Sequence, residues 1–119
     1  MSDPSEDKAT RAGQLDVLLE TIRSRRSDDP ASSYTASLLA RGPLKCAQKL
    51  GEEAVETIIA AASADRGEMV KESADLLYHW LVLLTSLDID PSEVYAELAR
   101  REGVSGHTEK AGRKSDAQS

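Results

Sequence analysis

The segment from Glu68 to Leu87, EMVKESADLLYHWLVLLTSL, constrains the fold more than any other part of the chain. It contains no proline or glycine, and its apolar residues recur at the spacing of an α-helix. These side chains cover most of the helix circumference, which is typical of a buried helix. The remaining narrow stripe is polar and consists of Glu68, Glu72, Asp75, His79 and Ser86. We therefore predict a helix inside a bundle, with its polar stripe facing either solvent or an internal polar site.

Helical periodicity and turn signals divide the rest of the chain into further helices. We expect short helices over 15–26 and 33–42, a second long helix over 43–64, and a last helix from about 91 to 101. Ser33 and Asp90 are the expected helix caps. A tight connection over 65–67 would make the two long helices an antiparallel pair. The predicted fold is an all-α helical bundle.

The length of 119 residues fits one domain. We expect a disordered N-terminal tail over 1–13, a helical domain over 14–103 and a flexible C-terminal tail over 104–119. Phenylalanine is absent, so the core must be mainly aliphatic. The helix over 68–87 has more apolar surface than a single helical hairpin can cover. We therefore expect a second copy of the chain to complete the bundle as a homodimer.

Charge and composition argue against several classes of partner. The formal net charge is −6 without a basic stripe, which disfavours nucleic-acid binding. No apolar run approaches the roughly 20 residues of a membrane span, and the first residues do not resemble a signal peptide. Cys46 is the only cysteine, which rules out an intrachain disulfide and suggests a small core residue. We expect a cytoplasmic protein with neither membrane nor nucleic-acid partners.

Two acidic pairs lie on the two long helices. Glu53 and Glu56 are three residues apart, as are Glu72 and Asp75, so each pair shares one helix face. If the pairs face each other, four carboxylates converge, and divalent cations would offset the cost of gathering their charges. Oxygen ligands favour Mg²⁺, with Mn²⁺ as an alternative, over zinc. The competing interpretation is an ordinary solvated acidic face, which Glu52 on the flank of the first pair also fits.

These acidic pairs stand within longer motifs. The motifs are SYTASLL (33–39), KCAQKLGEEAVETIIAA (45–61), ESADLLYHWLVLL (72–84) and PSEVYAELARR (91–101). In these motifs the chain resembles the phosphoribosyl-ATP pyrophosphatase family of histidine biosynthesis, within the all-α nucleoside-triphosphate pyrophosphohydrolase (MazG-like) superfamily. The similarity covers roughly residues 15–101, and Cys46 stands where a larger aliphatic residue is expected.

The resemblance implies Mg²⁺-dependent hydrolysis of phosphoribosyl-ATP to phosphoribosyl-AMP and pyrophosphate, the second step of histidine biosynthesis. It also implies a helical dimer with active sites near the subunit contact. Carried over by position, Glu53, Glu56, Glu72 and Asp75 would hold Mg²⁺. Glu52 would lie just outside this set and support it or activate water.

Other residues near the acidic pairs are candidates for substrate binding. Lys45 and Lys49 lie one helical turn apart and are suited to contact phosphates. The alternative is an ion pair, of Lys49 with Glu53 or of Lys45 with nearby acids. Tyr34 and Thr35 could contact the base, ribose or phosphates, or serve only in packing. His79 could hydrogen-bond a metal-binding carboxylate or be a buried core histidine.

Two other functions remain open from the sequence. One is a house-cleaning pyrophosphohydrolase acting on ordinary or damaged (d)NTPs, which needs the same carboxylates but a different base pocket. The other is a non-enzymatic helical dimerisation module with a structural acidic stripe. Only the SYT (33–35) and ADLLYH (74–79) motifs favour the histidine-pathway enzyme over the first alternative.

Overall fold

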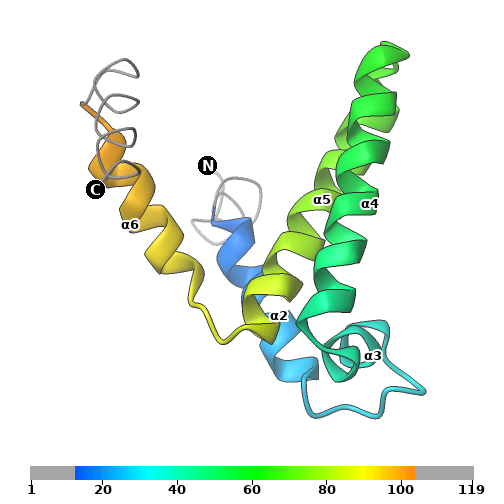
Figure 1. Ribbon diagram of the computed structural model, residues 1–119, viewed down its shortest axis with the longest axis vertical. Helices are drawn as coiled ribbons and strands as arrows, with labels where there is room; N and C mark the ends of the chain where they lie inside the picture. The colour runs from blue at the N-terminus through cyan, green and yellow to red at the C-terminus, as the bar shows by residue number, and fades with distance from the viewer. Residues whose placement is uncertain (1–12, 104–119) are drawn as a thin grey trace, which may run out of the picture. The chain divides into compact units, whose positions relative to one another are not determined.

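The computed structural model describes residues 13–103, and this part is helical (Figure 1). Its helices are α2 (Gln14–Arg25), α3 (Tyr34–Arg41), α4 (Pro43–Ala62), α5 (Arg66–Ser86) and α6 (Pro91–Arg101). No strand occurs between residues 13 and 103, so the all-α prediction is confirmed there. The expectations for the tails over 1–12 and 104–119 lie outside the described residues. Over 13–103, no helix is long and apolar enough to cross a bilayer.

The helices α4 and α5 are the longest, and they lie side by side (Figure 1). Only residues 63–65 connect them, so the prediction of a connection over 65–67 is wrong by two residues. The difference arises because Asp65 caps α5, with its Oδ1 accepting a hydrogen bond from the Glu68 backbone N–H at 3.1 Å. Asp65 and Glu68 form the spacing of a capping box, which already places Arg66 in the helix.

The first turn of α3 carries two of the predicted substrate-binding residues, Tyr34 and Thr35. Ser33 caps this turn as predicted, because its Oγ accepts a hydrogen bond from the Ala36 backbone N–H at 3.2 Å. The helix ends at Gly42, whose φ of +90° lies in the region that favours glycine. Pro43 then starts α4, so that Gly42 alone separates α3 from α4.

The core lies where α2 and α3 meet α4 and the C-terminal half of α5. Its fully buried members are Ile22, Leu38, Cys46, Leu81 and Val82. The thiol of Cys46 donates a hydrogen bond to the Leu38 carbonyl at 3.4 Å, and burial raises its pKa. Cys46 is therefore a core residue, as the sequence predicts.

The burial of α5 is less even than its sequence suggests. Its buried residues all lie between His79 and Thr85, whereas Val70 is 67% exposed. The reason is that α2 and α3 do not reach the N-terminal half of α5. Within one chain, the burial predicted for this helix is therefore found only in its C-terminal half.

The helix α6 belongs to a second compact unit that begins at Asp90. Asp90 caps it as predicted, because its Oδ1 accepts a hydrogen bond from the Ser92 backbone N–H at 2.9 Å. Near its end, Glu97 pairs with Arg100 at 2.7 Å and Arg101 at 3.0 Å. These two guanidinium groups lower the pKa of Glu97 to about 2.

Candidate metal centre

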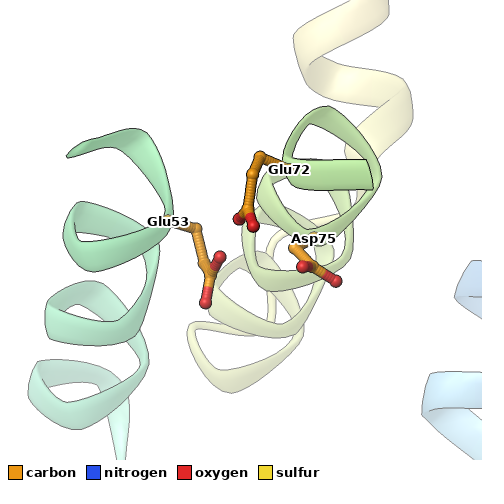
Figure 2. A group of neighbouring side chains, drawn as sticks. All are labelled: Glu53, Glu72 and Asp75. Atoms are coloured by element: carbon orange, nitrogen blue, oxygen red, sulfur yellow. The ribbon is translucent and has the colours of Figure 1, made fainter. Parts of the chain in front are cut away.

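Three carboxylates from two helices converge at the interface of α4 and α5. Glu53 reaches from α4 toward Glu72 and Asp75 on α5 (Figure 2). One oxygen from each residue lies within 4.8 Å of the others, and all three residues are partly buried. The three-residue spacing of Glu72 and Asp75 places both on one face of α5, and the packing of the helices brings Glu53 opposite them.

The crowding of these negative charges changes the ionisation of Glu72. Its pKa is raised, first by partial burial and then by the neighbouring carboxylates of Glu53 and Asp75. The ionised form of the cluster therefore carries an electrostatic cost. A divalent cation between the three side chains would offset this cost, and the all-oxygen donor set suits Mg²⁺ or Mn²⁺.

Glu56, the fourth predicted ligand, lies at the edge of this cluster. It is exposed on α4, one turn after Glu53, and does not belong to the group of three converging carboxylates. Its charge nevertheless contributes to the raised pKa of Glu72. The structure thus brings three of the four predicted ligands together and leaves Glu56 beside them.

Glu52 is directed toward a different set of partners. Its carboxylate pairs with Lys49 at 3.0 Å and accepts a hydrogen bond from Gln48 at 3.1 Å. These contacts lower the pKa of Glu52, and Lys45 adds a smaller effect of the same sign. The ion pair considered for Lys49 therefore exists, but it joins Lys49 to Glu52 rather than to Glu53. It leaves Glu52 a weaker base than an ordinary glutamate.

A group of aromatic and polar side chains connects α3 to α5 beyond the carboxylates. The hydroxyls of Thr35 and Tyr78 are hydrogen-bonded to each other, and Thr35 is buried. The Tyr34 hydroxyl lies 3.4 Å from His79 Nε2. His79 Nδ1 lies 2.8 Å from the backbone carbonyl oxygen of Asp75, not from its carboxylate. Of the two alternatives for His79, the structure therefore favours the buried histidine with both nitrogens paired.

Sequence reasoning did not find the contacts of Tyr34 with His79 and of Thr35 with Tyr78. These pairs join residues that are 45 and 43 positions apart. Helical spacing relates residues within one helix only, so no signal in the sequence could reveal these pairings. The adjacent positions of the partners, 34–35 and 78–79, are the only trace that the sequence carries.

We predict that Glu72→Gln raises the melting temperature of the protein in EDTA at neutral pH. Because the pKa of Glu72 is raised by folding, its ionised form destabilises the fold at pH values above that pKa, and the neutral amide removes this effect. Circular dichroism melts measure the change. Mg²⁺ should raise the melting temperature of the unmodified protein more than that of the variant.

The control for this experiment is Glu20→Gln, which removes an exposed charge from α2. It should leave both the melting temperature in EDTA and its response to Mg²⁺ close to those of the unmodified protein. A Glu72→Gln protein that melts at a lower temperature in EDTA would contradict the electrostatic description of the cluster.

Comparisons with known proteins identify the family of this chain. The family model described as phosphoribosyl-ATP pyrophosphohydrolase matches residues 15–102. A phosphoribosyl-ATP pyrophosphatase of Parvibaculum lavamentivorans is 65% identical over 88% of this chain and 96% of its own length. The protein of that name from Roseobacter denitrificans is 56% identical over 83% of this chain and 94% of its own length. The one from Azospirillum brasilense is 51% identical over 93% of this chain and 99% of its own length. The chain therefore belongs to the phosphoribosyl-ATP pyrophosphohydrolase family.

Proposed function

We propose that this protein hydrolyses phosphoribosyl-ATP to phosphoribosyl-AMP and pyrophosphate, the second step of histidine biosynthesis. The observation that carries the proposal is the convergence of Glu53, Glu72 and Asp75 within the region that the family model matches. The curated relatives carry the name of this activity. A biosynthetic role also agrees with the cytoplasmic location expected from the sequence.

The three converging carboxylates are suited to bind Mg²⁺, with Mn²⁺ as an alternative. They offer only oxygen ligands, they come from two packed helices, and their mutual repulsion favours occupation by a cation. When bound, Mg²⁺ supplies the positive charge that neutralises the phosphate oxygens and the leaving pyrophosphate. Glu53, Glu72 and Asp75 would hold it at the interface of α4 and α5.

Glu56 is suited to accept the proton of the attacking water. The sequence alone predicts Glu56 as a fourth metal ligand. Its side chain is exposed at the edge of the cluster, and this position suits a residue that faces the substrate and the attacking water better than a metal ligand. Glu52 is less suited to this role because its pairing with Lys49 lowers its pKa. We therefore assign proton transfer to Glu56 and the orientation of Lys49 to Glu52.

Lys49, Lys45 and Tyr34 are the groups that we assign to substrate binding. An ion pair at the protein surface contributes only about 0–1 kcal/mol. The pair of Lys49 with Glu52 is partly exposed, so Lys49 can exchange Glu52 for phosphate oxygens at little cost. Lys45 lies one turn before Lys49 on the same face of α4. Tyr34 is exposed, whereas Thr35 is buried and supports Tyr78.

The proposed reaction is tested by measuring pyrophosphate release from phosphoribosyl-ATP with Mg²⁺, beside a panel of NTPs and dNTPs. We expect rapid release from phosphoribosyl-ATP alone and its loss in EDTA. Release mainly from NTPs or dNTPs would instead support the house-cleaning activity. The absence of release from every substrate would favour the non-enzymatic dimerisation module.

The assignments of Glu56 and Asp75 predict two different kinetic defects. Asp75→Asn should raise the Mg²⁺ concentration that half-saturates activity and reduce activity by about two orders of magnitude or more, beyond the 10–100-fold typical of residues that surround metal ligands. Glu56→Gln should reduce kcat by roughly 10²- to 10⁴-fold with an unchanged Mg²⁺ requirement. Steady-state kinetics over a Mg²⁺ titration distinguish the two.

Circular dichroism controls for the folding of both variants. If Glu56→Gln strongly increased the Mg²⁺ requirement, Glu56 would be a metal ligand, as the sequence predicts, and not the proton acceptor. Full activity of Asp75→Asn would refute the metal centre.

We also propose that α4 and α5 form an antiparallel pair and that a second copy of the chain covers their exposed apolar surface. Ile58 on α4 and Val70 on α5 are each 67% exposed. Val55, Ile59 and Leu77 are further exposed apolar residues on the same two helices. A neighbouring cavity of about 400 Å³ at the 63–65 connection is lined mainly by alanine, Met69 and Val70. Exposed apolar surface of this kind is typical of a protein–protein interface.

The dimer is tested by Ile58→Asp, which should shift the protein from dimer to monomer. Burying an unpaired carboxylate in an apolar interface is costly, so the dimer dissociation constant should rise at least about tenfold. Sedimentation velocity over a concentration series measures it. Val17→Asp, on an exposed apolar position of α2, is the matched control and should remain dimeric. A monomeric unmodified protein at micromolar concentration would refute the proposal.

A further inference from the structure

His79 is buried in α5, and its hydrogen bonds fix which ring nitrogen carries the proton. Only 6% of its surface is exposed. Its Nδ1 lies 2.8 Å from the Asp75 carbonyl oxygen, which can only accept, so Nδ1 carries the hydrogen. In the neutral ring Nε2 is then an acceptor. The Tyr34 hydroxyl, 3.4 Å away, therefore donates its hydrogen to Nε2.

Tyr34 is held by buried and partly buried partners although its own ring remains open to solvent. Its exposed fraction is 55%. The ring lies nearly parallel to that of Tyr78, at 21° with centroids 6.5 Å apart, and meets His79 edge-on at 6.2 Å. Thr35, the next residue, anchors the same turn of α3 through its hydrogen bond to Tyr78. The Tyr34 ring is thus fixed at its hydroxyl while much of its surface stays accessible.

This arrangement connects an oriented aromatic ring to the helix that carries two of the proposed metal ligands. His79 joins Tyr34 to the turn of α5 that carries Asp75. A planar base stacks well on an exposed aromatic side chain, and an orientation fixed in advance reduces the entropy lost on binding.

We propose that His79 is a positioning residue that holds the Tyr34 ring in the orientation in which it stacks on the base of the nucleotide. The inference rests on the proposed hydrolysis of phosphoribosyl-ATP and adds a determinant of substrate affinity to it. His79 touches neither the substrate nor the reacting atoms, and it acts through Tyr34. A histidine that served only packing would affect stability and leave the affinity for nucleotides unchanged.

The test uses a double-mutant cycle of Tyr34→Phe and His79→Asn, with His79→Gln as the matched control. The amide nitrogen of asparagine can replace Nδ1 of histidine, but its side chain does not reach the position of Nε2. Glutamine reaches that position and offers its amide oxygen to the Tyr34 hydroxyl. We would measure kcat and KM for phosphoribosyl-ATP at saturating Mg²⁺, and the Kd for AMP in EDTA by calorimetry.

Loss of one hydrogen bond between side chains predicts a roughly three- to tenfold increase in KM and in the Kd for AMP. Tyr34→Phe and His79→Asn should show this increase separately, with kcat little changed, and the double variant should be no weaker than either single variant. His79→Gln should stay near the unmodified protein. Unchanged KM and Kd in Tyr34→Phe, additive effects, or a loss confined to kcat would each overturn the proposal.

Two further outcomes keep the inference separate from the activity that it builds on. If the His79 variants fail to fold, Tyr34→Phe decides alone, because it removes only one hydroxyl from a side chain that is 55% exposed. If the unmodified protein does not hydrolyse phosphoribosyl-ATP, the proposed function fails, and the Kd for AMP still tests the role of His79. The role of His79 would be overturned if the unmodified protein did not bind AMP. It would also be overturned if the Kd for AMP were the same in the unmodified protein, both single variants and the double variant.

Discussion

Repulsion between carboxylates across the α4–α5 interface is the constraint on which the site depends. Glu53 faces Glu72 and Asp75 at the line where the two longest helices pack, and the raised pKa of Glu72 reflects the crowding of their charges. Without a cation between them, these carboxylates would only lower the stability of the fold. The arrangement is explained if a divalent cation holds the three groups together and the phosphates of the substrate complete its coordination.

The helices α2 and α3 serve to hold this interface in place. α2 and α3 pack against the C-terminal half of α5 and form the buried core around Leu38 and Leu81. This packing brings Tyr34, in the first turn of α3, within reach of His79. The N-terminal half of α5 has no such cover, and Val70 remains exposed. The site thus lies between a well-packed end of the helix pair and an apolar surface suited to a second subunit.

Periodicity was sufficient to predict most of the helices and the common face of each acidic pair. Three-residue spacing fixes the relative direction of Glu72 and Asp75 without any knowledge of the fold. The side-chain partners were harder to predict, because rotamers decide that Glu52 pairs with Lys49 while Glu56 stays at the edge of the cluster. The apolar circumference of α5 predicted a buried helix in a bundle that a second copy completes, and within one chain only its C-terminal half is buried. Helical spacing alone cannot distinguish cover by the same chain from cover by another.

The most direct test of the metal centre is the anomalous diffraction of crystals grown with Mn²⁺, collected near the manganese absorption edge. The account predicts an anomalous peak between the carboxylates of Glu53, Glu72 and Asp75, at about 2.0–2.3 Å from the oxygen atoms of each, as for other small hard cations. The peak should be absent from crystals of Glu72→Gln. Fully occupied manganese elsewhere, with none at these carboxylates, would contradict the central claim.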